Sequence, residues 1–181
     1  MPVLGRERLQ EGLAYILGSP RDEGRLEMVV RRPAEGEREV VAEARIEPGQ
    51  GLVGDSWSTR AKVSPDAEIT LMNARCIALL AGDADRWPLA GDQLYVDMDL
   101  SEENLPPGSR LRIGTVLLEA SAKPHRGCPK FSARFGTEAL VFVSSEAGRA
   151  ARLRGLNARL VEGGAVIVGD VVTKLPRDQR A

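Results

Sequence analysis

Short strand-like runs separated by glycine and proline turns dominate this sequence, and they limit the folds that are open to it. The runs are rich in Val, Leu and Ile and are too short for long helices. In the first run, Leu26, Met28 and Val30 alternate, so we expect them to share one face of a strand. About eight short strands with few helices favour a β-barrel or a β-sandwich. The runs span residues 25–31, 38–47, 67–72, 94–98, 110–119, 140–143, 158–162 and 165–175.

Short helices are predicted beside these strands. Apolar residues at helical spacing predict one helix over residues 5–17. Asn73 is expected to cap a helix over residues 74–81, and Ser145 is expected to cap a helix that ends at Arg154. The sequence therefore predicts a mainly β protein of the α+β class.

The composition excludes several classes of protein. The chain has 25 Lys and Arg against 26 Asp and Glu, a net charge of −1, whereas nucleic-acid binders usually carry a basic excess. Two cysteines are too few for a disulfide framework or for a structural zinc site made of thiolates. One histidine rules out a His-rich metal site within one chain. Aromatic residues make up only 4% of the chain, so the core must be aliphatic.

Length and hydropathy predict one domain over residues 1–181 in the cytoplasm. A chain of 181 residues is typical of a single domain. No apolar run approaches the ~18 residues of a membrane span, so we expect no membrane partner. Residues 1–8 lack the apolar core of a signal peptide, which favours a cytoplasmic location.

A local basic island stands out in this chain of balanced charge. Residues 120–137 contain no Asp or Glu, and His125 and Cys128 lie at their centre. Such a segment attracts anions, although its cations could also form a solvated face. The basic side chains of the island belong to Lys123, Arg126, Lys130 and Arg134.

Cys128 is the strongest candidate for a reactive group. Pro129 favours the first position of a helix, which Gly136 would end, so Cys128 is expected at the N-cap. Free backbone N–H groups and nearby cations in such a position favour the thiolate over the thiol. The alternative is that Cys128 is a small buried residue. Cys76 lies within an amphipathic helical pattern and is expected in the core.

Other candidates have weaker support. His125 could form a dyad with Cys128 or join it on a metal, or it could make a capping hydrogen bond or be exposed. Asp55 ends a glycine-rich loop whose backbone could approach a ligand, or it could belong to an ordinary turn. Arg154 and Arg159 could bind an anion or only coat a strand.

Several segments, in their order and spacing, resemble the MOSC family, which is named after the C-terminal domain of molybdenum-cofactor sulfurase. The resemblance covers about residues 45–175. It rests on GLVGD (51–55), ITLMNARCIALL (69–80), NLPPGSRLRIGTVLLEAS (104–121), PHRGCPKF (124–131), LRGLNARLVEGG (153–164) and VGDVV (168–172).

The resemblance implies a β-barrel of the pyruvate-kinase type with a few short helices. It implies that Cys128 holds a persulfide or gives a thiolate ligand to molybdenum, and that the cofactor is the molybdenum cofactor, molybdopterin. The partner would be a sulfur donor such as a cysteine desulfurase, or an electron-donor protein. By position, residues placed to bind the cofactor are Lys123, Arg126, Lys130, Arg134, Asp55 and Arg159, with Cys128 and His125 as the catalytic pair.

The sequence departs from the family pattern at three places. Many members have a histidine after the Gly-Asp pair, where this chain has Ser56 and Trp57. Many have a second cysteine where this chain has Phe131, and an Arg-Asn pair is not evident near residues 91–93. No pyridoxal-phosphate site is expected in the chain, nor the extra N-terminal barrel of the amidoxime-reducing relatives.

Three functions remain open on the sequence alone. The first is a sulfur carrier or molybdenum-cofactor protein that uses Cys128. The second is a molybdenum-dependent reductase of N-hydroxylated compounds, which would need an electron donor. The third is a binding module in which the barrel holds an anionic metabolite and Cys128 does no chemistry.

Alkylation of the two cysteines tests whether Cys128 is a reactive thiolate. We expect Cys128 to react at neutral pH faster than an ordinary free cysteine, because its surroundings favour the thiolate. Intact mass and peptide mapping across a pH series would measure both rates in the reduced protein, with Cys76 as the internal control. Equally slow alkylation of both residues would favour the binding module.

Overall fold

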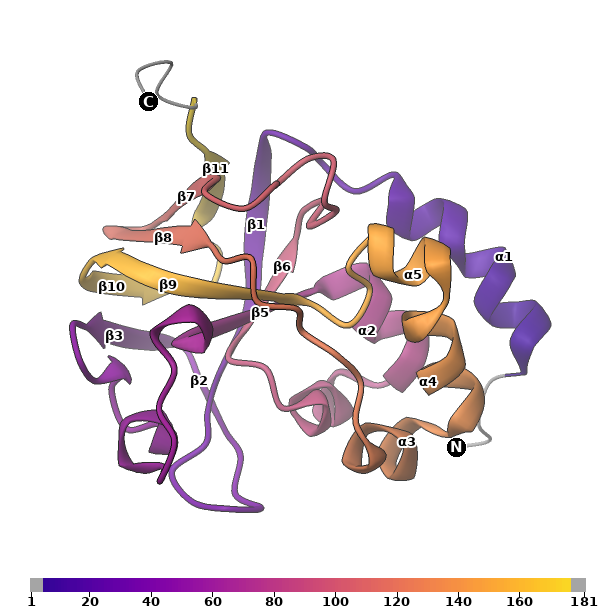
Figure 1. Cartoon of the computed structure of the whole chain (residues 1–181), viewed down its shortest axis with the longest axis horizontal. Helices are drawn as coiled ribbons and strands as arrows, with labels where there is room; N and C mark the ends of the chain where they lie inside the picture. The colour runs from indigo at the N-terminus through magenta and orange to yellow at the C-terminus, as the bar shows by residue number, and fades with distance from the viewer. Residues whose placement is uncertain (1–4, 177–181) are drawn as a thin grey trace.

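Seven strands close into a barrel in the computed structural model, which describes residues 5–176 (Figure 1). The barrel strands are β1 (Glu23–Arg31), β5 (Ile69–Asn73), β6 (Leu94–Asp97), β7 (Arg110–Ile113), β8 (Val116–Ala120), β9 (Leu156–Glu162) and β11 (Val171–Lys174). Around the barrel the order is β1-β11-β7-β8-β9-β5-β6, and β6 pairs again with β1. Only β5 and β6 run parallel among these described neighbours. The barrel alternative of the prediction is therefore confirmed.

Four shorter strands extend the barrel. They are β2 (Glu39–Val41), β3 (Glu43–Glu47), β4 (Gly51–Leu52) and β10 (Gly164–Ile167). β2 pairs with the end of β1, and β10, β3 and β4 form a small separate sheet. Three predicted runs were wrong as single strands, because each holds two: β2 with β3, β7 with β8, and β10 with β11. At Gly114, between β7 and β8, φ is +54° and a Cβ would lie 2.6 Å from the Ala165 carbonyl oxygen, so the chain reverses there.

A bulge in β1 sends its side chains to two different cores. The register of β1 against β6 shifts between Leu26 and Met28. As a result Leu26 and Val29 enter the barrel core, whereas Met28 and Val30 face the helices. The prediction that Leu26, Met28 and Val30 share a face is wrong, because a bulge adds one residue and reverses the alternation.

The helices form a layer against one side of the barrel, on the right in Figure 1. They are α1 (Arg6–Leu17), α2 (Ala74–Ala81), α3 (Pro129–Phe135), α4 (Thr137–Ser144) and α5 (Glu146–Ala150), together with the 3-10 helix η3 (Ala84–Ala90). The core of this helical layer packs on Met72 and Tyr95 of the barrel wall. Two further 3-10 helices lie away from the layer: η1 (Ser56–Thr59) beside β4 and η2 (Pro65–Ala67) beside β9. Within residues 5–176 no helix has the length and apolarity needed to cross a bilayer. Cys76 is fully buried in the core of the helical layer, as predicted. Asn73 caps α2, as predicted, because its side-chain oxygen accepts the backbone N–H of Cys76.

Two predicted elements near the site were wrong. Residues 140–143, expected as a strand, belong to α4, because a short apolar run fits a buried helix as well as a strand. Ser145 caps α5 as predicted, but the helix ends at Ala150 rather than at Arg154. Arg152 then takes a left-handed conformation with φ of +47°, which turns the chain toward β9.

We expect Gly24→Ala to weaken the barrel where β1 meets both β6 and β11. An added Cβ would lie 2.3 Å from the Asp97 carbonyl oxygen, a backbone atom that cannot rotate away. The free energy of unfolding should fall by about 1–3 kcal/mol, as for other overpacked sites. Urea denaturation measures it. Gly5→Ala is the control, because nothing lies within 4 Å of its Cβ position, and a similar loss in both variants would contradict the clash.

Candidate functional site

The segment that follows β8 carries the predicted site residues and is fixed to its neighbours. The Ser121 N–H donates to the Asn157 carbonyl (2.9 Å), and the Asn157 side chain donates to the Lys123 carbonyl (3.1 Å). The Ser121 hydroxyl donates to the Asp66 carbonyl (2.7 Å). These bonds tie the segment to β9 and to η2, so that His125 and Cys128 follow from an anchored backbone.

A buried ion pair lies beside His125. The Asp92 carboxylate is inaccessible to solvent, and Arg154 Nη1 donates to its Oδ2 at 2.7 Å. His125 Nδ1 lies 3.4 Å from the other oxygen, Asp92 Oδ1. The Arg154 guanidinium also lies over the Phe131 ring, 5.0 Å from its centre. Phe131 therefore packs against this ion pair.

Gly155 makes room for the imidazole. Its φ is +117°, and a Cβ would lie 2.9 Å from His125 Nδ1 and 2.4 Å from the Leu71 carbonyl oxygen. A side chain at this position would therefore collide with β5 and with the histidine.

Burial keeps His125 neutral. Loss of solvent lowers the pKa of His125 to about 4, and the charge of Arg154 adds to that effect, while Asp92 opposes it. Of the alternatives predicted for His125, exposure is wrong, since its side chain is only 15% exposed. Because Nδ1 faces a carboxylate, we assign its proton to Nδ1, which leaves Nε2 as an acceptor.

Four arginines bind four consecutive carbonyls at the end of η3, and we call them the arginine row. The carbonyls belong to residues 88–91, at the C-terminal end of the 3-10 helix, where backbone oxygens are partly negative. The Pro88 oxygen also accepts the Gly91 backbone N–H (3.1 Å). The donors come from three separate parts of the chain, since Arg32 and Arg38 are only six residues apart. Arg38 Nε donates to Pro88 O (3.1 Å), Arg134 Nη1 to Leu89 O (2.8 Å), Arg154 Nη2 to Ala90 O (3.0 Å) and Arg32 Nη1 to Gly91 O (2.6 Å).

The arginine row carries more charge than its counter-ions balance. Asp55 pairs with Arg32 through two hydrogen bonds of 2.7 and 2.9 Å, and Asp92 pairs with Arg154. Arg38 and Arg134 have no carboxylate partner among residues 5–176. Burial lowers the pKa of Arg38, and the neighbouring Arg134 and Arg32 lower it further. The row therefore offers positive charge to an anion.

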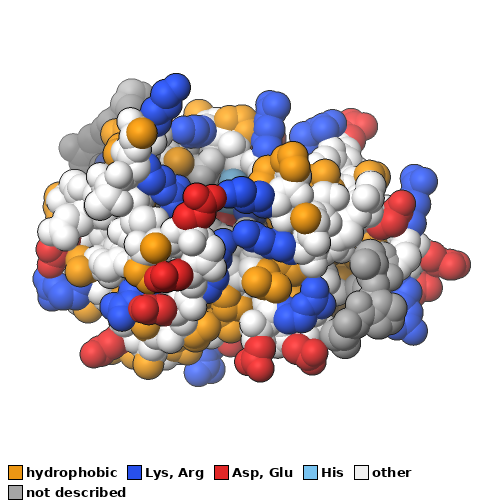
Figure 2. Space-filling view, turned by 90° about the horizontal axis from the view of Figure 1, so that it is seen from below, with side chains coloured by type: hydrophobic (Ala, Val, Ile, Leu, Met, Phe, Trp, Pro, Cys, Tyr) orange, Lys and Arg blue, Asp and Glu red, His pale blue; other side chains and the backbone are white. Residues whose placement is uncertain are grey.

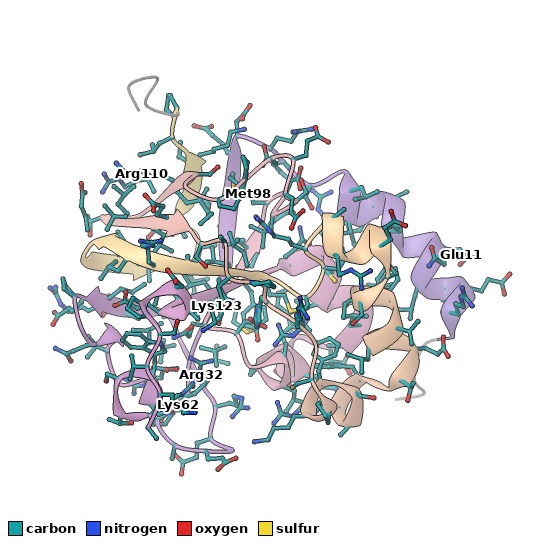
Figure 3. All side chains as sticks on the ribbon, viewed as in Figure 1. Glu11, Arg32, Lys62, Met98, Arg110 and Lys123 are labelled. Atoms are coloured by element: carbon teal, nitrogen blue, oxygen red, sulfur yellow. The ribbon has the colours of Figure 1, made fainter. Side chains whose placement is uncertain are left out.

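The face seen from below shows this charge. In Figure 2, Lys and Arg side chains gather around a hollow, and the pale blue of the chain's single histidine is visible inside it. Figure 3 labels Lys123 and Arg32, and both lie below β9 in that view. The basic island and the arginine row thus belong to the same region of the molecule.

Cys128 begins α3 as predicted, but its sulfur does not cap the helix. Its thiol is free and the residue is exposed, so the buried alternative is wrong. No side-chain hydrogen bond caps α3; instead the Cys128 carbonyl accepts the N–H groups of Phe131 and Ser132. Cys76 differs in every respect, because burial raises the pKa of its thiol to about 12 and its Sγ donates to the Leu153 carbonyl.

The other predicted residues have separate places. Asp55 is buried, and it orients Arg32 and caps η1 through the Trp57 N–H. Lys130 forms an exposed ion pair with Glu35, and Arg134 joins the arginine row. Arg159 lies between two carboxylates, Asp66 (3.2 Å) and Glu119 (3.7 Å), which balance its charge.

Sequence reasoning missed three members of the site: Arg32, Arg38 and Asp92. It had named Arg154, with Arg159, as a residue that could bind an anion. Asp92 lies in residues 91–93, where the expected Arg-Asn pair was not evident, so the resemblance gave no signal for it. Arg32 and Arg38 carried none, because only the fold brings them to residues 88–91.

A cleft of about 510 Å³ opens beside the same segment. One wall is residues 121–127, and the other comes from the ends of α4 and α5 and from residues 152–157. It brings together Lys123, His125 and Arg126, which the sequence singled out, with Arg149 and Arg152, which it did not. Cys128 follows directly after the last residue of this wall.

No part of residues 5–176 gathers three or more His, Cys, Asp or Glu side chains around a possible metal position. A metal bound to Cys128 would therefore need its other ligands from outside these residues. A cofactor that brings such ligands together with an anionic group suits one exposed thiol beside the arginine row.

The single histidine allows a direct test of its buried state. We expect its imidazole to titrate in NMR near pH 4 rather than near the ordinary 6.5. The unfolded chain then takes up the proton first, so stability is complete above about pH 6.5 and falls as pH drops toward 4. His125→Gln should flatten this part of the urea-unfolding profile. A midpoint near 6.5 would contradict the assignment.

Solved structures with the same architecture have little sequence similarity to the chain. YuaD protein from Bacillus subtilis matches with a TM-score of 0.57 at 18% identity, over 83% of this chain and 94% of that one. YiiM from Escherichia coli matches with a TM-score of 0.57 at 20% identity, over 85% and 71%. YiiM from Geobacillus stearothermophilus matches with a TM-score of 0.54 at 15% identity, over 87% and 75%. At these identities the likeness shows the fold.

The sequence itself settles the family. No curated protein matches the chain. The family profile described as MOSC domain matches residues 58–173, which include both β5 and the segment of His125 and Cys128. Because this match covers more than half of the residues, the chain belongs to the MOSC domain family.

Proposed function

We propose that this protein binds the molybdenum cofactor at Cys128 or carries activated sulfur there as a persulfide. The observation that supports the proposal is one exposed thiol, three residues after a histidine that burial keeps neutral and at the start of α3, the helix that carries Arg134 of the arginine row. The second thiol, Cys76, is buried and protonated, so it cannot compete for either role.

The chain's residues fit a cofactor that has a phosphate and a metal with ligands of its own. Cys128 would supply one thiolate to molybdenum, and Arg38 and Arg134, which lack carboxylate partners, would bind the phosphate. When bound, the cofactor supplies two-electron redox chemistry at the metal. His125, which burial keeps neutral, would offer Nε2 as a hydrogen-bond acceptor to a bound group.

The persulfide alternative needs only the thiolate and a donor. The Cys128 thiolate would attack the terminal sulfur of a donor persulfide, such as that of a cysteine desulfurase. A new S–S bond forms at Cys128 Sγ, the donor's S–S bond breaks, and the donor leaves as a thiolate, so no oxidant is consumed. The cations of the basic island, Lys123 and Arg126 among them, favour the anionic forms on both sides of the exchange.

Loading experiments on three proteins test the proposal: wild type, Cys128→Ser and Cys76→Ser. Each is incubated with molybdenum cofactor, or with a cysteine desulfurase and cysteine. Metal content and intact mass are then measured. We expect wild type and Cys76→Ser to retain molybdenum or to gain one sulfur atom, because their exposed thiol is intact, and Cys128→Ser to do neither.

The outcomes separate the candidate functions. Molybdenum retained with a thiol left unmodified by the desulfurase favours cofactor binding, and sulfur gained without molybdenum favours the carrier. If wild type takes up neither group, or if Cys128→Ser takes up both as well as wild type, the proposal is wrong and the binding module becomes the better reading.

A further inference from the structure

The cleft beside residues 121–127 has the size of a small-molecule site. Its volume of about 510 Å³ lies within the range of ligand pockets, roughly 300–1,000 Å³. Its second wall, from α4, α5 and residues 152–157, contributes nothing to the arginine row except Arg154. The cleft therefore needs an explanation beyond the cofactor proposed for Cys128.

Four of the five Lys and Arg side chains that line the cleft lack counter-ions, and the fifth, Arg154, pairs with Asp92. The side chains of Lys123 and Arg126 have no ion-pair or hydrogen-bond partner within the described part of the chain. Arg149 donates to the Ser144 carbonyl (2.6 Å) and Arg152 to the Leu105 carbonyl (2.6 Å), which carry no charge. Glu102 is the one acidic residue among those that line the cleft.

Nine of the nineteen arginines within residues 5–176 form salt bridges with carboxylates: Arg21, Arg31, Arg32, Arg45, Arg75, Arg110, Arg112, Arg154 and Arg159. The other ten are spread over the molecule, but three of them, Arg126, Arg149 and Arg152, line this one cleft together with Lys123. Such a concentration of unpaired cations in a concave site favours an anion.

Two arginines of the cleft have unusual surroundings: Arg152 has a strained backbone, and the side chain of Arg154 is buried. Arg152 is the one non-glycine residue within 5–176 with a positive φ, and unusual backbone of this kind concentrates at functional positions. Burial lowers the pKa of Arg152, and the charge of Glu102 opposes that effect. The Arg154 side chain is only 9% exposed, and its Nε has no hydrogen-bond partner in the described structure.

We infer that this cleft binds a small molecule with a phosphate group, at a site distinct from the arginine row. Guanidinium groups match the oxygens of phosphate with paired hydrogen bonds, and Arg149 and Arg152 supply two of them. Lys123 and Arg126 add charge from the opposite wall. The site requires neither molybdenum nor the Cys128 thiol, so it exists in the protein without cofactor.

Inorganic pyrophosphate, titrated into the full chain without cofactor at constant ionic strength, tests the inference. Calorimetry gives the Kd, and amide shifts in ¹⁵N NMR locate the site. We expect shifts at residues 121–127 and 148–157. In the double variant Arg149→Gln/Arg152→Gly, Kd should rise about tenfold, as expected for the loss of two charge-assisted contacts. Glycine at position 152 suits the positive φ, so this variant keeps the backbone.

The matched control is Arg45→Gln/Arg110→Gln, which removes the same charge from exposed arginines that pair with carboxylates on the barrel. Its Kd should stay within about twofold of wild type, since these charges are screened by solvent. Equal losses in both double variants would show charge screening only and overturn the inference. So would the absence of binding, or shifts confined to residues 32–38 and 88–91.

Cys128→Ser separates this inference from the proposed function. It should bind pyrophosphate like wild type, because the cleft ends before Cys128, whereas it should fail in the loading experiments. A loss of pyrophosphate binding in Cys128→Ser would overturn the independence of the cleft.

Discussion

The buried pair of Asp92 and Arg154 is the interaction on which the rest of the site depends. It joins the end of η3 to the start of β9, and it places a carboxylate beside His125 and a guanidinium over Phe131. Neither charge can be removed alone without leaving the other uncompensated in a dry environment, at a cost of about 3–5 kcal/mol. The carboxylate lies 3.4 Å from His125 Nδ1 without a hydrogen bond, and the guanidinium packs on Phe131 of α3, so one ion pair contacts both the histidine and the helix that begins after Cys128.

The arginine row has the same origin in an unsatisfied backbone. A 3-10 helix that ends inside the molecule leaves carbonyls that need donors, and four guanidiniums donate to them, although the Pro88 carbonyl also accepts the Gly91 N–H. Each of these bonds satisfies a neutral acceptor with a charged donor, so hydrogen bonding is balanced while charge is not. Anion affinity at this place is thus a by-product of how the loop before β6 is held, and the fold needs these arginines whether or not a ligand is present.

Local signals predicted more of the structure than of the site. The short strands, the cap at Asn73 and the helix that starts after Cys128 all follow from residues near one another in sequence, whereas the choice of a barrel over a sandwich came from the family resemblance. The β1 bulge and α4 were missed, because alternation and apolar runs do not report which partner an element meets. Arg32 and Arg38 were missed for the same reason: their meeting with η3 depends on barrel closure, a long-range property that no short motif encodes.

Gly155 lies between the barrel strand β5 and His125, and it is the absence of its side chain that matters to the site. Its missing side chain leaves the space in which the imidazole lies against β5, and its positive φ begins the strand that follows. A relative that keeps this histidine must also keep glycine here, even if it binds another ligand. Alanine, the smallest replacement, would collide with the imidazole. Among distant sequences, a glycine here paired with a histidine thirty positions earlier would therefore mark the chains that keep a buried, neutral imidazole.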